Sequence, residues 1–112
     1  MLYAKNQKIH TLMFESLRVT VSGAEKLREE VRIDFKKRFG KDILEGFGTT
    51  ETSPVATCNL PDVIAPDYTV QVGQKTGTVG MAIPGTTIKI VDPQSFEELE
   101  ANEEGMILIS GI

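Results

Sequence analysis

The sequence has 112 residues, a length that suits one domain or a piece of a larger one. Its net charge of −4 argues against a nucleic-acid binder, because affinity for phosphates needs clustered lysine and arginine. Cys58 is the only cysteine, so an internal disulfide is excluded, and the sequence has no apolar stretch as long as a transmembrane helix.

The first part of the chain predicts a helix and a strand followed by a second helix. Residues 1–16 are expected to form a helix, or a helix and a loop. Residues 17–21 alternate between apolar and polar types, which is typical of a half-buried strand. Ser22 and Glu25 have the spacing of a capping box, which predicts a helix start here, and Gly40 is a suitable stop. The apolar stripe of this helix is expected to comprise Leu27, Val31, Phe35 and Phe39.

A second strand is predicted at residues 42–45, directly before a glycine-rich loop at residues 46–51. The strand–helix–strand order indicates a βαβ-like unit, and ligands of open α/β sheets bind at the carboxyl ends of strands. Residues 59–69 are expected to be an irregular connection. Four short antiparallel strands should follow, bounded by glycine and proline. They are expected at residues 70–72, 78–81, 86–91 and 106–109.

The predicted fold class is therefore an α/β fragment with two parts. Residues 1–66 form the βαβ-like part, and residues 67–112 form a small antiparallel sheet or partial barrel. The division follows the change in composition near residue 67.

The loop Gly-Phe-Gly-Thr-Thr-Glu at residues 46–51 has residue types that point to nucleotide chemistry. Glycines allow a close ligand approach, while threonine hydroxyls and free amides can bind phosphate oxygens. Glu51 would repel a phosphate unless a divalent cation lay between them, and Phe47 offers a face for stacking on a base. On spacing alone, a turn that binds nothing is an equal alternative. A Walker A loop does not fit, because Lys75 lacks a glycine directly before it, and a dinucleotide fingerprint needs glycine where Glu51 stands.

The order of motifs resembles the adenylate-forming superfamily of acyl-CoA synthetases, luciferases and peptide-synthetase adenylation domains. Residues 46–51 resemble its Tyr-Gly-x-Thr-Glu motif, and residues 21–27 resemble its Ser-Gly-Gly/Ala loop. Residues 77–92 are similar to its Gly-x-Val-Gly, Pro-Gly and strand-Asp block, and residues 105–111 to the strand after it. With Asn-Leu-Pro at residues 59–61, the sequence is most similar to the long-chain acyl branch. Within that branch it most resembles the acyl-ACP synthetase part of 2-acylglycerophosphoethanolamine acyltransferases.

The resemblance implies roles for individual residues. Thr50 matches the threonine that contacts the α-phosphate or acyl-adenylate, and Glu51 matches the carboxylate that holds Mg²⁺, so these two are the expected catalytic residues. Phe47 stands where the family commonly has tyrosine, so a contact by the phenol hydroxyl is missing. The residues expected to bind the nucleotide are Gly23, Ala24, Glu25, Gly46, Phe47, Gly48, Thr49 and Thr50.

The expected parent protein is an AMP-forming ligase that uses ATP and Mg²⁺ to convert a fatty acid into acyl-AMP. It then passes the acyl group to the thiol of acyl carrier protein or CoA, with a link to lysophospholipid reacylation. The family's phosphate loop should precede residue 1, and its ribose-binding Asp and catalytic Lys should follow residue 112. The chain alone is therefore expected to be inactive and to bind no cofactor.

Two expectations concern partners and location. Apolar edges of the chain predict a homo-oligomer for the fragment. The parent is expected in the cytoplasm, or at the inner face of the membrane. Two alternatives stay open, a non-catalytic module that binds a nucleotide or an acyl chain, and a structural fragment that binds nothing.

Overall fold

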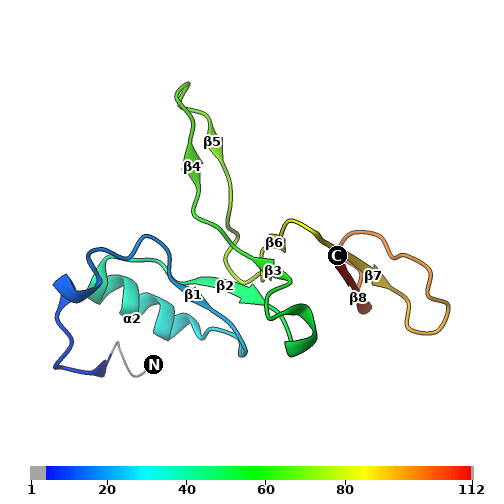
Figure 1. The fold of residues 1–112 in the computed structure, drawn as a ribbon, viewed down its shortest axis with the longest axis horizontal. Coiled ribbons are helices and arrows are strands. Elements are labelled where there is room, and N and C mark those ends of the chain that lie inside the picture. Colours follow the sequence, from blue (N-terminus) through cyan, green and yellow to red (C-terminus); the bar gives the residue numbers. More distant parts are fainter. Residues whose placement is uncertain (1–4, 112) are drawn as a thin grey trace.

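The computed structural model describes residues 5–111, and the first half of this part is organised around one helix (Figure 1). Helix α2 (Glu29–Phe39) has two glutamates in its first turn and three basic residues in its last turn, which complements the helix dipole. It ends where the sequence predicts. Gly40 adopts the left-handed conformation, with φ of 64°, and its amide donates to the carbonyl of Lys36 at 2.8 Å.

The predicted start of this helix at Ser22 is wrong. The helix begins at Glu29, and its N-cap residue, Arg28, makes no side-chain capping hydrogen bond. Residues 23–28 form a loop instead, in which Ala24 has a left-handed φ of 70° that a right-handed helix cannot contain. The amide of Leu27 donates to the Glu45 carboxylate at 3.0 Å, so a contact distant in sequence replaces the expected local cap.

An aromatic cluster attaches the N-terminal segment to α2. Phe14, at the end of the short 3-10 helix η1 (Thr11–Phe14), lies with its ring centroid 4.6 Å from that of Phe39 and 5.8 Å from that of Phe35. Both helix residues are buried. Of the helix or helix and loop predicted for residues 1–16, the described part holds a helical residue at Lys5, then loops and η1, and residues 1–4 lie outside the described residues.

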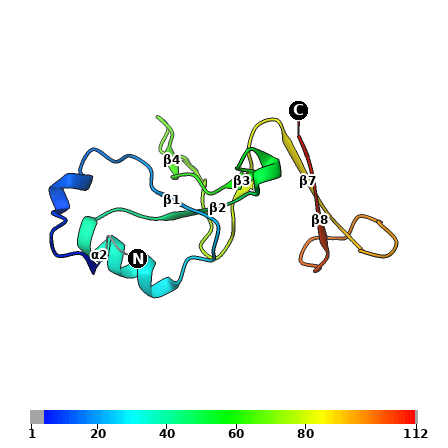
Figure 2. The same ribbon diagram turned by 60° about the horizontal axis from the view of Figure 1, so that its bottom comes forward.

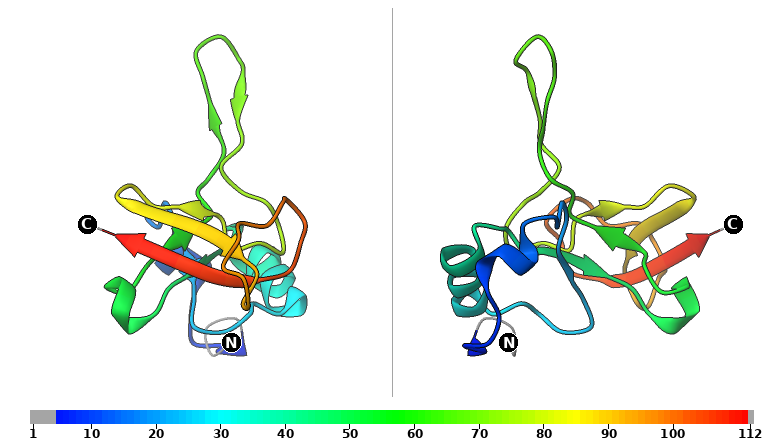
Figure 3. Two further views of the ribbon diagram at one scale, coloured as in Figure 1. Left: turned by 90° about the vertical axis from the view of Figure 1, so that its right-hand side faces the viewer. Right: turned by 60° about the vertical axis from the view of Figure 1, so that its left-hand side comes forward.

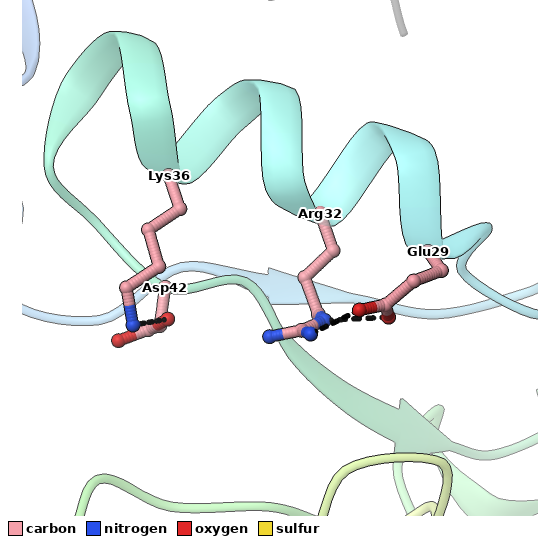
Figure 4. A network of polar contacts seen from close by, with 4 residues as sticks. All are labelled: Glu29, Arg32, Lys36 and Asp42. Atoms are coloured by element: carbon pink, nitrogen blue, oxygen red, sulfur yellow. Dashed lines mark hydrogen bonds and ion pairs between the residues drawn. The ribbon is translucent and has the colours of Figure 1, made fainter.

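Ion pairs follow one side of α2 (Figure 4). Arg32 donates from Nε to Glu29 at 2.8 Å, within the helix. Lys36 Nζ lies 2.7 Å from the carboxylate of Asp42, just before the next strand. These pairs are exposed, and exposed pairs add little to stability, so the aromatic contacts contribute more to holding the helix in place.

The main sheet has the strand order β1-β2-β3-β6. Strands β1 (Val21–Ser22) and β2 (Leu44–Phe47) are parallel and α2 connects them, which confirms the βαβ-like unit. Strands β3 (Thr57–Cys58) and β6 (Met81–Ala82) extend the sheet in antiparallel fashion. The strand predicted at residues 17–21 is shorter than expected, because β1 starts only at Val21.

Two antiparallel hairpins complete the structure. Strands β4 (Val63–Ile64) and β5 (Val70–Gln71) form a hairpin that projects from the body (Figures 1 and 3). The irregular connection predicted for residues 59–69 therefore contains a strand. Strand β7 (Thr86–Val91) has the predicted bounds and pairs along its whole length with β8 (Met106–Gly111).

The predicted class, an α/β part followed by antiparallel strands, is confirmed, but β4–β5 and β7–β8 form two separate two-stranded sheets where the sequence predicts one small sheet or partial barrel. Strand β6 lies in the main sheet beside β3, at residues 81–82 rather than 78–81. The division of the chain at residue 66 stays a prediction. Within residues 5–111, no helix combines the length and apolar character needed to cross a membrane.

The described chain is extended, with α2 and the β7–β8 hairpin at opposite ends (Figure 2). Its radius of gyration is 16.8 Å, whereas a compact chain of this length would have about 13 Å. Its accessible surface is 9022 Å², against about 6,100 Å² for a compact monomer of this mass. The buried apolar residues are Phe35, Phe39, Leu44, Ala56 and Val91. Much of the apolar surface is thus uncovered within the described residues.

Candidate functional site

The glycine-rich loop starts at the carboxyl end of β2, where Gly46 pairs with Cys58 and Phe47 with Thr57. Beyond the strand, the loop folds back closely on itself. A Cβ placed on Gly48 would lie 1.8 Å from the carbonyl oxygen of Pro54, so the backbone leaves no room for any side chain there. Gly48 is therefore required by the packing of the loop itself, before any ligand is considered.

The second half of the loop is the 3-10 helix η2 (Thr50–Thr52), which is fixed by a reciprocal contact. The Thr52 hydroxyl accepts from the Thr49 amide at 2.8 Å and donates to the Thr49 carbonyl at 2.9 Å. The chain then reverses at Ser53, which has a left-handed φ of 56° and precedes a cis peptide bond to Pro54. This contact gives the short segment that carries Thr50 and Glu51 a defined conformation.

Glu51 presents an exposed carboxylate that is ionised at neutral pH. A hydrogen bond from the Thr49 side chain, helped by the backbone amide of Glu51, lowers the pKa of this carboxyl group below its ordinary value of 4.5. Among residues 5–111, no three His, Cys, Asp or Glu side chains gather to hold a metal ion. A single ionised carboxylate still fits Mg²⁺, which proteins often bind through one or two carboxylates together with substrate phosphates.

Two segments predicted to bind the nucleotide meet at one cleft of about 350 Å³, here called the glycine cleft. Gly23 lies beside this contact, because a Cβ on it would be 3.5 Å from the carbonyl oxygen of Gly46. The structure thus brings together residues more than twenty positions apart in sequence. The glycine cleft is lined by Ala24, Glu25, Lys26, Glu45, Gly46, Phe47, Gly48, Gly77, Thr78 and Val79.

Thr49 and Glu51 face a different cleft, of about 630 Å³, here called the hairpin cleft. Its other wall comes from the turn at residues 83–86 and from β8. The loop contributes to both clefts, with residues 46–48 lining the glycine cleft and Thr49 and Glu51 lining the hairpin cleft. Thr50 is exposed and lines neither of them. The hairpin cleft is lined by Thr49, Glu51, Thr52, Ser53, Val55, Ile83, Pro84, Gly85, Thr86, Ile107, Ile109 and Gly111.

Two polar residues that the sequence analysis did not assign to the site contribute to the glycine cleft. Glu45 lies on its wall and holds the loop before α2 through the Leu27 amide. Asn59 is buried at the end of β3 and donates to the carbonyls of Glu45 and Thr78. Asparagine side chains commonly bind backbone groups nearby in sequence, but these partners lie 14 and 19 positions away and cannot be read from the sequence.

A family model described as "AMP-binding enzyme" matches residues 1–112. The chain is 34% identical over 112 residues to "Probable 4-coumarate--CoA ligase 2" of Dictyostelium discoideum, covering 98% of this chain and 18% of that protein. It is 29% identical over 106 residues to "Long-chain-fatty-acid--CoA ligase" of Salmonella typhimurium, covering 95% of this chain and 17% of that protein.

Solved structures show the same relationship. Apo MatB from Rhodopseudomonas palustris superposes with a TM-score of 0.76 and 26% identity, covering 96% of this chain and 20% of that chain. The chain therefore spans about a fifth of the length of these proteins. The match of the family model over all 112 residues shows that the chain belongs to the AMP-binding enzymes of the adenylate-forming superfamily, and that it is related to CoA ligases.

Proposed function

We propose that this chain forms the adenine-binding wall and part of the phosphate-binding region of an ATP-dependent acid–thiol ligase. The observation that carries the proposal is the meeting of Ala24 and Glu25 with Gly46, Phe47 and Gly48 around the glycine cleft. These are the residues for which the family resemblance predicts nucleotide contacts. A cleft of this kind, with glycine backbone on one side and an aromatic ring nearby, suits a flat purine base.

In this proposal, one cleft beside the loop binds the base and the other binds the phosphates. In the proposed complex, Phe47 and the backbone at residues 23–25 hold the base at the glycine cleft. Thr49 and Glu51 then face the phosphates from the hairpin cleft, and Thr50, exposed between them, contacts the α-phosphate. Bound Mg²⁺ would neutralise phosphate charge near Glu51, whose ionised carboxylate suits this role. The chain positions the nucleotide so that the α-phosphate is accessible to an acid.

The acid and the acceptor thiol form the finer part of the proposal. We favour a fatty acid as substrate and the thiol of CoA or acyl carrier protein as acceptor. The long-chain-fatty-acid–CoA ligase among the relatives supports the first choice. The similarity of residues 45–54 and 59–61 to acyl-ACP synthetases, which would connect the protein with lysophospholipid reacylation, is the reason for retaining acyl carrier protein. A location in the cytoplasm, or at the inner face of the membrane, stays a prediction.

The test is ATP–pyrophosphate exchange by the full-length protein that carries these 112 residues. Purified protein is given Mg²⁺, ATP, labelled pyrophosphate and one acid at a time, from a set of short-, medium- and long-chain fatty acids and 4-coumarate. We expect exchange that depends on a fatty acid. Exchange with 4-coumarate alone would correct the substrate, and no exchange with any acid would contradict a ligase and favour a binding module.

The same ATP–pyrophosphate exchange is measured with the 112-residue chain alone, to compare its activity with that of the full-length protein. We expect no exchange from this chain alone, because adenylation needs several groups to stabilise the transferring phosphate at once. Activity above a blank without protein would show that residues 1–112 contain the complete catalytic machinery.

A further inference from the structure

We infer that Asn59 and Thr57 are positioning residues that hold the loop at residues 75–79 in place as the far wall of the glycine cleft. This inference rests on the proposed function, because the cleft that they shape is the one proposed to bind the base. Neither residue lines the cleft itself. Their side chains act through backbone groups of the loop, and together they are called the Asn59–Thr57 clamp.

Asn59 uses both polar atoms of its side chain to join β2 to this loop. Its Nδ2 donates to the Glu45 carbonyl at 3.0 Å and to the Thr78 carbonyl at 2.7 Å. Its Oδ1 accepts from the Lys75 amide at 2.9 Å. The residue is only 4% exposed, so losing any of these contacts would leave buried polar groups without a partner.

Thr57 repeats this arrangement two residues earlier. Its hydroxyl donates to the Val79 carbonyl at 2.7 Å, and the residue is buried. The loop approaches the strand so closely that a Cβ on Gly80 would lie 2.2 Å from the Asn59 amide nitrogen. Thr57 in β3 and Asn59 directly after it thus fix three backbone positions of the loop, at Lys75, Thr78 and Val79.

The loop also has a hydrogen bond of its own. The Thr78 hydroxyl donates to the carbonyl of Lys75, which is a contact within the loop. Gly77 has a left-handed φ of 79°, and a Cβ placed on it would have no atom within 4 Å apart from those of its chain neighbours. Because Gly77, Thr78 and Val79 line the glycine cleft together with Ala24 and Glu25, the clamp fixes the position of this part of its wall.

The main test variant is Asn59→Asp in the full-length protein. It keeps the size of the side chain and the acceptor for Lys75, but removes both N–H donors and places a carboxylate against two carbonyls. The matched control is Asn102→Asp, the same chemical change at an exposed residue. A second pair is Thr57→Val, which removes the hydroxyl at similar volume, and Thr57→Ser, which keeps the hydroxyl and removes a methyl group.

Two quantities are measured well below the unfolding temperature of each variant. Hydrogen exchange followed by mass spectrometry on the peptide spanning residues 73–80 measures how firmly the clamp holds the loop. Calorimetric titration with AMP measures the affinity of the glycine cleft for the nucleotide. In Asn59→Asp and Thr57→Val we expect exchange faster by about tenfold and AMP affinity weaker by about ten- to hundredfold. Asn102→Asp and Thr57→Ser should keep the wild-type affinity, even where Thr57→Ser unfolds at a lower temperature.

The outcomes separate the inference from the proposed function. An unchanged hydrogen-exchange rate in Asn59→Asp and Thr57→Val would overturn the inference. Faster hydrogen exchange with unchanged AMP affinity would also overturn it. Equal loss of affinity in Thr57→Val and Thr57→Ser would also overturn it, because a hydroxyl-dependent role predicts a difference. If the wild-type protein binds no AMP, the proposed function fails, and the exchange measurement alone decides whether the clamp exists.

Discussion

The carboxylate of Glu45 accepts a hydrogen bond from the backbone amide of Leu27 at 3.0 Å, across eighteen positions of the sequence. Glu45 is the last residue before the glycine-rich loop, and Leu27 lies in the loop at residues 23–28, which also contains Ala24 and Glu25. This one contact therefore connects the two segments that meet at the glycine cleft.

Replacing Glu45 should affect both stability and nucleotide affinity. Glu45→Ala removes the acceptor of the Leu27 amide, and a hydrogen bond to a charged group contributes about 1.5–3 kcal/mol. We expect the free energy of unfolding to fall by about 1–2 kcal/mol and AMP affinity to weaken. Glu45→Gln keeps an acceptor oxygen and should retain most of the stability and most of the AMP affinity. Urea unfolding and AMP titration of the full-length variants test this, and an Ala variant with wild-type affinity would contradict the positioning role.

Glu51→Ala should reduce adenylation without unfolding the protein. Removing one preorganised group at a developing charge costs roughly 10²–10³ in rate, and the side chain of Glu51 is exposed. The measurement is ATP–pyrophosphate exchange by the full-length protein at saturating Mg²⁺. Glu104→Ala, the same change at another exposed glutamate, is the control. A wild-type rate for Glu51→Ala would remove Glu51 from the site.

Thr49→Val should raise the pKa of Glu51 toward its ordinary value of 4.5, because the Thr49 side chain is the largest cause of the lowered pKa. In the wild-type fold this interaction stabilises the ionised form. Its contribution is present above the ordinary pKa and is lost as the pH falls through the lowered value. Carbon-13 NMR titration of the glutamate carboxyl groups measures the shift. Thr49→Ser, which keeps the hydroxyl, should leave the Glu51 pKa low, and equal values in all three proteins would contradict the assignment.

Phe47 is expected to stack on the base. Phe47→Tyr should change ATP affinity little, since both rings offer the same face and tyrosine is common at this position in the family. Phe47→Ala should weaken ATP binding by about 1–2 kcal/mol, as the loss of an aromatic stack on a base does. Titration of the full-length variants with ATP distinguishes a ring that stacks on the base from one that only packs against protein. An Ala variant that is less stable but binds ATP equally well would show that the ring only packs against protein.

The 112-residue chain should self-associate when it is purified alone. Within residues 5–111, β8 pairs with β7 on one edge only, and hairpin β4–β5 exposes Ile64, Tyr68 and Val72. Covering such apolar surface stabilises an assembly by about 25 cal/mol per Å² before entropy costs. Light scattering across a dilution series should give a mass above that of the monomer at high micromolar concentration. A strictly monomeric mass there would refute the expectation.

Local rules predicted the parts of the fold that depend on a single residue or a short pattern. The left-handed Gly40 ends α2 as expected, and alternation of residue types located β7 with its bounds. The start of α2 could not be predicted in the same way. Ser22 and Glu25 match a capping box, but the amide of Leu27 is bound by Glu45 from another strand, and a local rule contains no such partner.

The candidate site shows the same limit. The family resemblance selected both segments of the glycine cleft, and their meeting is a matter of geometry that only the structure supplies. In the sequence, Asn59 resembles one branch of the family, while in the structure its hydrogen bonds reach backbone groups of residues 45, 75 and 78. Backbone partners leave no mark in the sequence, because any residue type provides the same amide and carbonyl.

Hairpin β4–β5 is joined to the body at a narrow base that can be defined atom by atom. The Leu60 amide donates to the Gly73 carbonyl at 2.9 Å, and the Asp62 carboxylate accepts from the Gly73 amide at 2.8 Å. A Cβ on Gly73 would lie 2.7 Å from the Leu60 carbonyl, so this base is closely packed. Beyond it the hairpin projects from the rest of residues 5–111 (Figure 3). The turn at residues 65–69 is therefore a suitable place to insert an epitope or a fluorophore-binding peptide, which would report on the protein in cells without entering either cleft.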